Sequence, residues 1–398
     1  MRWQSDDFLV QFSILYAGKS ISRQIIQKVV LYLGLPLVVS MEHHGCVFSF
    51  NDFKSGGRQI RPLSEVDVKQ TLAWLITILL ILALFAPMHL HAEKIRVGSG
   101  GFTPLHSMIW AAHDQGVFKK YGFDVEYLAL NSGTLGAQTL LSNEIQFLFS
   151  TGALAVTANL QGGDMTMVSG GFNFFAFKLV ARPEIKSAED LKGKRFAISQ
   201  FGSATDFAVQ ASLEKLGINP KQASLIQLGG NPSRIAALTG GSADASVFSE
   251  PVATLAIKKY RMNLILDMAA AGLAFPQSTL MVKRSYLEAN RDKVTSFLKA
   301  MIEGLYIVKK DKALAIQLTK KYIRAEDEMY AVGYDYFLGQ YGEDLLNMPD
   351  RKGLELVIAQ TAKTNPKAKG QTPESLRLMD ASVLEEIKKS GFVDKLKR

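Results

Sequence analysis

Three short loops rich in glycine, serine and threonine carry the side chains that this sequence offers for binding a small molecule. They lie at residues 100–103, 150–152 and 202–205. Each stands just before a segment with helical periodicity, where the unpaired N–H groups and partial positive charge of a helix N-terminus favour a bound anion. An ordinary N-cap serine or threonine gives the same pattern, so the loops predict a site only as a set.

Two further side chains extend this candidate site. His106 follows the first loop, and Glu250 precedes Pro251 at the end of an apolar run. Glu250 is suited to receive a ligand amine or hydroxyl, or else to favour the start of the next helix. Phenylalanines crowd the same positions. We expect some to wall a flat or partly apolar ligand and others to be core packing: Phe102, Phe172, Phe174, Phe175, Phe201, Phe248 and Phe275.

The composition offers little for catalysis. The chain has one cysteine, Cys46, and His106 and His113 stand seven apart rather than at the i, i+4 spacing of a zinc-binding pair. A Gly-x-Ser-x-Gly elbow and a Walker loop are both missing, and the glycines at 98–101 lack the third glycine of a dinucleotide fingerprint. We therefore expect no catalytic residue, no metal and no cofactor. The net charge of +9 comes without blocks of lysine or arginine, so we expect no nucleic-acid partner.

Two units with the same order of elements position these loops. The first has a predicted strand at 95–99 and a helix ending near 116, and the second has a strand at 196–200 and a helix at 206–216. Later in each unit a helix end, a turn and a buried strand lead into a further loop. Two such units predict two similar α/β lobes. Because ligands bind beyond the carboxyl ends of strands in open α/β sheets, all these loops should face one crevice.

The connections between the lobes follow from changes in pattern. A polar stretch at 182–190, after a predicted strand at 177–181, reads as the crossing from lobe one (93–182) to lobe two (183–277). A strand at 278–282 then begins the return of the chain to lobe one. The returning segment is 278–398, and it includes long helices predicted at 288–309, 312–322 and 381–390. Two crossings make a hinge that can close.

The segment before the lobes has the form of a leader. Residues 72–88 carry no charged side chain, Lys69 precedes them, and Ala92 offers a small residue for cleavage. We interpret 68–92 as a cleaved signal peptide, with an uncleaved membrane anchor as the alternative. Residues 1–67 are then either a misassigned start or a cytoplasmic extension. Since no cysteine follows the apolar run, an acylated lipoprotein is excluded, and we expect a periplasmic protein.

Several segments resemble a known family. Residues 110–126 read WAAHDQGVFKKYGFDVE, and residues 186–194 read KSAEDLKGK ahead of the second unit. Both are similar to the substrate-binding proteins of nitrate, sulphonate, taurine and thiamine-pyrimidine ABC importers. The resemblance implies a periplasmic-binding-protein type II fold: two α/β lobes joined by a two-strand hinge, with a helical C-terminal tail packed on lobe one. It covers residues 94–310, and the remaining tail matches only in helical character.

The resemblance also implies where a ligand would bind. Family contacts carried over to this chain, with His106 from the reasoning above, give the candidate ligand-binding residues: Phe102, Thr103, His106, Ser150, Thr151, Gly152, Asn173, Gly202, Ser203, Ala204, Thr205 and Glu250. The implied partners are a small-molecule ligand and an ABC importer permease in the inner membrane, for a chain expected to be a monomer.

The function expected from these observations is that of an extracytoplasmic solute-binding protein. It would capture a small organic molecule, such as a sulphonate, an aromatic carboxylate or a pyrimidine-like compound, between two lobes. One alternative is an enzyme on the same fold acting on a pyrimidine-like or aromatic substrate, although the cysteine motif of the family's enzymatic branch has no counterpart here. The other is a membrane-tethered sensor domain, which requires the apolar segment to be retained.

Overall fold

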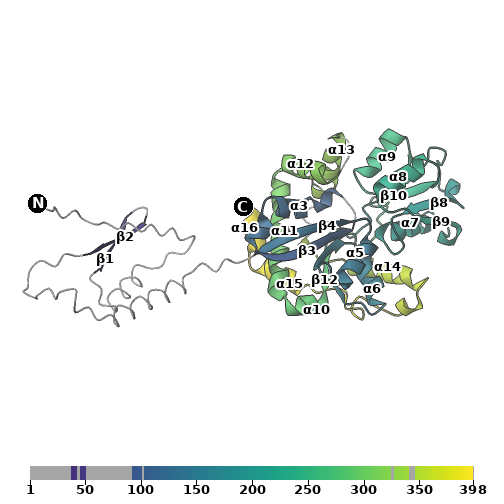
Figure 1. Cartoon of the computed structure of the whole chain (residues 1–398). Coiled ribbons are helices and arrows are strands. Elements are labelled where there is room, and N and C mark those ends of the chain that lie inside the picture. The colour runs from purple at the N-terminus through teal and green to yellow at the C-terminus, as the bar shows by residue number, and fades with distance from the viewer. Residues whose placement is uncertain are drawn as a thin grey trace, which may run out of the picture. The chain divides into compact units, whose positions relative to one another are not determined.

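The computed structural model describes residues 37–42, 45–50, 92–100, 103–323, 327–339 and 346–397 (Figure 1). The chain divides into two units, Met1–Met88 and His89–Arg398. In the first unit, β1 (Leu37–Glu42) pairs antiparallel with β2 (Gly45–Phe50). The predicted signal peptide lies outside the described residues except for Ala92. No helix in the described part of the chain combines the length and apolar character needed to cross a bilayer.

One five-stranded sheet forms the first lobe of the second unit. Its strands in spatial order are β4 (Phe123–Leu130), β3 (Glu93–Gly100), β5 (Phe147–Ser150), β12 (Thr279–Lys283) and β6 (Met165–Ser169). Strand β3 runs parallel to β4 and β5, whereas β12 runs antiparallel to β5 and β6. The early helices of this lobe are α3 (Ser107–Asp114), α4 (Val117–Lys120), α5 (Gly133–Leu141) and α6 (Ala153–Asn159), with the short 3-10 turn η2 (Pro104–His106) before them.

The second lobe repeats this plan strand by strand. Its sheet has the order β9 (Ser224–Gln227), β8 (Arg195–Ile198), β10 (Ala245–Phe248), β7 (Lys178–Ala181) and β11 (Asn263–Asp267), again with an antiparallel strand in the fourth place. Helices α7 (Ala204–Lys215), α8 (Asn231–Thr239) and α9 (Val252–Tyr260) accompany it, with 3-10 turns η3 (Glu189–Leu191) and η4 (Pro220–Gln222). The matching order confirms the predicted pair of similar α/β lobes in a type II periplasmic-binding-protein fold.

The position of β7 corrects one predicted boundary. This strand belongs to the second sheet, so the chain crosses between the lobes at residues 170–177 and not at 182–190. The polar segment 182–190 instead connects β7 to β8 within the second lobe. The predicted boundary was wrong because β7 is a short, almost wholly buried strand, and its residues do not show which of the two sheets it joins.

The two crossings run side by side and form the hinge. The N–H of Phe175 donates to the carbonyl of Leu273 at 3.0 Å, and the N–H of Phe275 donates to the carbonyl of Asn173 at 3.0 Å. The rings of Phe175 and Phe275 stack with their centroids 3.9 Å apart. The predicted strand at 278–282 appears as β12, which returns the chain to the first sheet.

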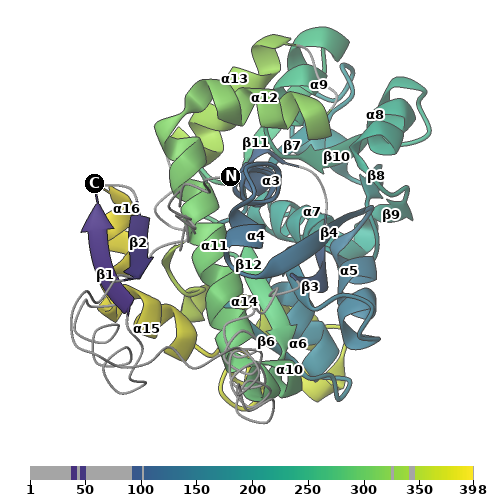
Figure 2. The ribbon, with the colours of Figure 1, turned by 60° about the vertical axis from the view of Figure 1, so that its left-hand side comes forward.

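The C-terminal helices pack mainly on the first lobe, as predicted. They are α10 (Arg284–Ala289), α11 (Arg291–Lys310), α12 (Lys312–Tyr322), α13 (Asp327–Tyr334), the π-helix η5 (Asp335–Gly339), α14 (Arg351–Ala362), α15 (Ser382–Lys389) and α16 (Phe392–Lys397), with a 3-10 turn η7 (Pro366–Ala368). Figure 2 shows α11 running beside α3 and α4. The helix predicted at 288–309 is two helices, α10 and α11, separated at Asn290.

Helix α11 crosses α3 at Gly304. A Cβ added to this glycine would lie 2.2 Å from the carbonyl oxygen of Met108 and 3.0 Å from the Cβ of Ala112. Only glycine therefore allows the two helices to approach this closely. The apolar face of α11, including Phe297, Met301 and Leu305, packs into the core of lobe one.

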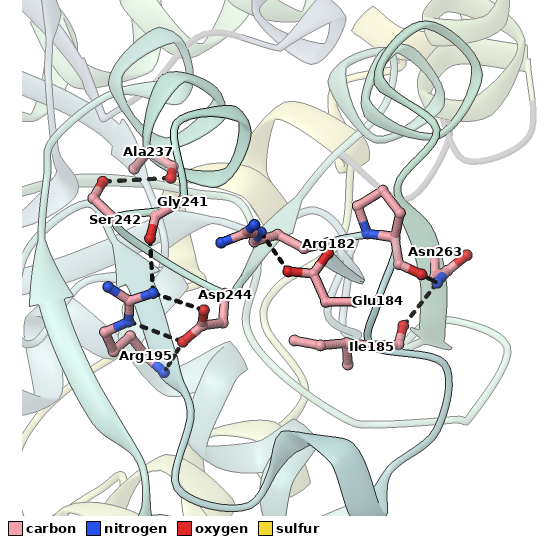
Figure 3. A network of polar contacts seen from close by, with 10 residues as sticks. Arg182, Glu184, Ile185, Arg195, Ala237, Gly241, Ser242, Asp244 and Asn263 are labelled. Carbon is pink, nitrogen blue, oxygen red and sulfur yellow. Dashed lines mark hydrogen bonds and ion pairs between the residues drawn. The ribbon is translucent and has the colours of Figure 1, made fainter.

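A polar network lies at the amino-terminal ends of β8 and β10 in the second lobe, opposite their carboxyl ends (Figure 3). The carboxylate of Asp244 accepts hydrogen bonds from the backbone N–H of Arg195 at 2.9 Å and from its guanidinium at 2.8 and 3.0 Å. The guanidinium also donates to the carbonyl of Gly241 at 2.8 Å. Hydrogen bonding from Arg195 holds the pKa of the Asp244 carboxyl below its usual range. The network ties the α8–β10 turn to the start of β8.

We expect Asp244→Ala to lower the free energy of unfolding by about 2 kcal/mol, because the Asp244 side chain is only 14% exposed and accepts three hydrogen bonds from Arg195. Glu184→Ala is the matched control. Glu184 is 57% exposed in its ion pair with Arg182, and its loss should change stability by less than about 0.5 kcal/mol. Urea denaturation of both variants gives the comparison. Equal effects would show that Asp244 does no more than a surface ion pair.

Candidate functional site

A cavity of about 460 Å³ lies between the two lobes. The carboxyl-terminal ends of β3, β5, β8 and β10 lead into it, as expected for ligand sites in open α/β sheets. Lobe one contributes the turn after β3, the start of α5 and the end of β5, and lobe two contributes the starts of α7, α8 and α9. A cavity of this size is typical of sites for small organic molecules.

The first predicted loop places His106 in the cavity wall. Its Nδ1 lies 3.2 Å from the backbone nitrogen of Thr103, which also lines the cavity, and 3.1 Å from the carbonyl oxygen of Thr103. The ring lies edge-on to Phe149 and parallel to Trp110. Burial lowers the pKa of His106 to about 4, so the imidazole is neutral at physiological pH. Phe102, the other residue predicted in this loop, lies outside the described residues.

The low pKa of His106 predicts a loss of stability in acid. Because the folded-state pKa lies below the unfolded value of 6.5, protonation favours the unfolded chain. The free energy of unfolding should fall as the pH drops from about 6.5 to about 4, by about 3 kcal/mol in total. Comparing His106→Gln with the native chain by urea denaturation across this range isolates the effect. If His106→Gln kept the full pH dependence of the native chain, His106 would not be its cause.

The second predicted loop is divided between the cavity and the hinge. Ser150 and Thr151 line the cavity. The hydroxyl of Thr151 and the N–H of Gly152 both donate to the carbonyl of Pro276, at 2.9 and 2.8 Å. A Cβ on Gly152 would come within 2.7 Å of the sulfur of Met167. Gly152 therefore packs against the hinge and does not line the cavity.

The third predicted loop supplies a cluster of hydroxyls from lobe two. Ser203, Ala204 and Thr205 line the cavity, and Ser203 caps α7. The hydroxyl of Ser199 donates to that of Ser203 at 2.9 Å, and the N–H of Ser199 donates to the hydroxyl of Thr205 at 2.8 Å. Gly202 does not line the cavity. Its N–H donates to the carboxylate of Asp206 at 2.8 Å, and the residue lines a separate cleft.

Glu250 and Asn173 also lie outside the cavity wall. One carboxylate oxygen of Glu250 accepts from the ammonium of Lys178 at 2.5 Å, and the other accepts from the N–H of Thr254 at 3.2 Å. The side chain of Asn173 accepts from the N–H of Asp350 at 2.7 Å. In the structure, Glu250 thus ties the start of α9 to β7, and Asn173 ties the hinge to the segment before α14.

The cavity has an aromatic wall, but not the predicted one. Its aromatic side chains are Phe149, Phe177, Tyr322 and Phe337. None of the predicted phenylalanines within the described residues lines it: Phe175 and Phe275 stack in the hinge, Phe172, Phe174 and Phe248 pack against the lobe cores, and Phe201 is 51% exposed. The prediction was wrong because closeness in sequence to a loop does not fix the direction of a side chain.

Sequence reasoning missed Arg234, a buried cation in the cavity wall. Its Nη1 donates to the hydroxyl of Ser246 at 3.0 Å and to the carbonyl of Val247 at 2.5 Å, and Nη2 donates to the side chain of Asn231. The guanidinium lies over the ring of Phe248, 4.9 Å from its centroid. Burial lowers the pKa of Arg234 to about 10, which still leaves it charged at neutral pH. One feature of the sequence could have indicated this: Arg234 stands among the apolar residues that form the buried face of α8.

The N-terminus of α5 was missed as well. Asn131, Ser132 and Gly133 line the cavity, and Ser132 caps the helix by accepting from the N–H of Leu135 at 3.1 Å. Two hydrogen bonds join this region to lobe two, and we call them the clasp. The hydroxyl of Ser132 donates to the side-chain oxygen of Gln200 at 2.5 Å, and the hydroxyl of Thr134 donates to the carbonyl of Phe201 at 3.1 Å. The lobes therefore touch across the cleft.

The described residues offer no group of three or more histidine, cysteine, aspartate or glutamate side chains arranged to hold a metal ion. The site provides a cavity between the lobes with hydroxyls, helix N-termini, an aromatic wall and one buried cation. This arrangement is suited to holding a small molecule between two lobes.

One family model and one curated relative match this chain. The family model described as NMT1/THI5 like matches residues 103–313. A Bacillus subtilis (strain 168) protein named as a binding protein, YtlA, is 26% identical over 222 residues, which are 53% of this chain and 65% of YtlA. The alignment therefore spans less than two thirds of the length of YtlA.

Solved structures share the fold at low identity. The alkanesulfonate-binding protein SsuA from Xanthomonas axonopodis pv. citri, bound to MOPS, matches with a TM-score of 0.59 at 16% identity, covering 69% of this chain and 93% of SsuA. The periplasmic nitrate-binding protein NrtA from Synechocystis PCC 6803 matches with a TM-score of 0.61 at 12% identity, covering 75% of this chain and 89% of NrtA. At these identities the likeness concerns the fold.

Proposed function

We propose that this chain, which belongs to the NMT1/THI5-like family, is a solute-binding protein of an ABC importer. The observation that carries the proposal is the cavity of about 460 Å³ between two hinged lobes, lined by hydroxyls and helix N-termini from both. A molecule bound there contacts the two lobes at once. It therefore stabilises the closed arrangement in preference to the open one.

Closure of the two lobes over the ligand is the proposed mechanism of binding. Moving the lobes from 1% to 99% closed requires about 5.5 kcal/mol of difference in ligand affinity between the two states. The clasp adds contacts that depend on closure, because Ser132 and Thr134 belong to lobe one and their acceptors to lobe two. The permease would then recognise the closed shape.

The proposed location is the periplasm, reached through the leader predicted at 68–92. The proposed ligand is a small organic molecule: a sulphonate, an aromatic carboxylate or a pyrimidine-like compound. Its candidate contacts are the predicted residues that line the cavity, namely Thr103, His106, Ser150, Thr151, Ser203, Ala204 and Thr205.

A thermal-shift screen of the full-length chain against these three classes tests the proposal. A ligand at 100 times its dissociation constant should stabilise the folded chain by about 2.7 kcal/mol. For any compound that binds, small-angle scattering should show compaction, and the compound should be recovered unchanged. Compaction without turnover supports a binding protein, whereas chemical conversion would favour the enzyme alternative. Absence of any stabilising compound would contradict the proposal.

A further inference from the structure

The wall of the cavity carries a single formal charge among the described residues. The lining contains no aspartate, glutamate or lysine, and its one arginine is Arg234. His106, the other ionisable base in the lining, is neutral because of its burial. The described lining residues therefore have a net charge of about +1 at neutral pH.

No carboxylate in the described part of the chain pairs with the charge of Arg234. Arg234 is 4% exposed, and its guanidinium donates to a hydroxyl, a backbone carbonyl and a side-chain amide oxygen, all of them neutral. These bonds occupy three of the five guanidinium N–H groups, and Nε is buried without an acceptor. A buried charge without an opposite charge is unfavourable, and a ligand anion would remove that penalty.

Part of the cavity wall in lobe one is apolar. Leu105, Phe149, Tyr322, Ile323 and Phe337 come from lobe one and its C-terminal helices and present apolar and aromatic surface. The cavity of about 460 Å³ is far larger than an inorganic oxyanion requires and is within the range of sites for small organic ligands. The site therefore combines a buried cation in lobe two with an apolar and aromatic patch in lobe one.

We propose that Arg234 receives the acid group of an organic monoanion whose uncharged, apolar part lies against Phe149, Tyr322 and Phe337. The inference rests on the proposed function and narrows it. Among the three ligand classes, it selects the carboxylates and sulphonates and excludes neutral or cationic pyrimidine-like compounds. A guanidinium suits both acids, because each offers two oxygens to neighbouring N–H groups.

Arg234 also has a structural role, and the test must distinguish this role from ligand binding. Its bonds to Ser246 and Val247 tie α8 to β10. A merely structural arginine would affect folding but would not discriminate between a charged ligand and a neutral one of the same shape. The discrimination between such a pair is therefore the readout.

The experiment is calorimetric titration of the full-length chain with matched probes. The acids are 2-naphthoate and naphthalene-2-sulfonate, and the neutral isosteres are 2-naphthamide and naphthalene-2-sulfonamide. We expect the native chain to bind at least one acid about 100-fold more tightly than its isostere. Arg234→Gln should remove this preference while leaving the affinity for the isostere within about threefold, and Arg234→Lys should recover part of it. Arg261→Gln, at an exposed arginine of the same lobe, should change nothing.

If Arg234→Gln fails to fold, the titration of the native chain with the acids and their isosteres still tests the proposal. Equal affinity of the native chain for an acid and its isostere would overturn the assignment of Arg234 and leave the proposed function standing. The same conclusion follows if Arg234→Gln binds the acid as the native chain does. A native chain that binds no probe here and no compound in the thermal-shift screen would contradict the proposed function, and this inference with it.

Discussion

Replacing Gly304 by alanine is expected to lower the free energy of unfolding by about 3 kcal/mol or more. The added Cβ would lie 2.2 Å from the carbonyl oxygen of Met108, a backbone atom within α3 that cannot turn aside as a side chain can. Helix α11 must then move away from α3 along the main helix contact of lobe one. Alanine is favoured over glycine inside a helix by about 1 kcal/mol, so the expected loss has the opposite sign to helix propensity.

Gly353→Ala is the matched control for this prediction. Gly353 is also a buried helical glycine, in α14, but a Cβ there would meet its nearest neighbours at 3.4 Å, an ordinary contact distance. This variant should be unchanged or more stable by up to about 1 kcal/mol. Urea denaturation of both variants provides the measurement. If Gly304→Ala were as stable as the native chain, α3 and α11 could not be packed as closely as described.

Replacing Ala204 by tryptophan is expected to weaken ligand binding by more than about 100-fold while leaving the unliganded fold intact. Ala204 lies in the first turn of α7, is only partly buried, and lines the cavity of about 460 Å³. An indole there would fill space that the ligand needs and would hold the lobes apart. The stabilisation by any compound found in the thermal-shift screen should therefore disappear.

Lys215→Trp tests whether a tryptophan on α7 is harmful in itself. Lys215 is exposed at the last turn of the same helix, far along the chain from the cavity lining. This variant should keep both the melting temperature and the ligand response of the native chain. If Ala204→Trp bound the same compound with native affinity, the cavity between the lobes would not be the binding site.

The architecture was largely predictable because local signals agreed with one another. Strands rich in buried apolar residues, loops with glycine and serine, and helices recur in the same order in both halves of the chain, which correctly predicted two similar lobes. The turn at Thr103, the end of β5 at Ser150 and the cap at Ser203 then came together, because the carboxyl ends of parallel strands share one edge of a sheet.

The errors concern long-range choices that local pattern does not encode. The strand at 178–181 has the composition of a buried strand in either lobe, so its sheet could not be chosen from its residues. Glu250 lies outside the cavity wall and pairs with Lys178 of a neighbouring strand, a contact that the residues around Glu250 do not indicate. Arg234 was overlooked for the opposite reason, since a single arginine in a helix normally faces solvent.

The sheet order also bears on how the chain folds. All five strands of lobe two lie in one uninterrupted stretch, from Lys178 to Asp267, whereas the sheet of lobe one needs β12 inserted between β5 and β6. Pairing β12 with β5 closes a loop of more than a hundred residues, which carries an entropic penalty unless the intervening chain is already compact. We therefore expect lobe two to assemble first and lobe one to set the folding rate, as the part with the higher contact order.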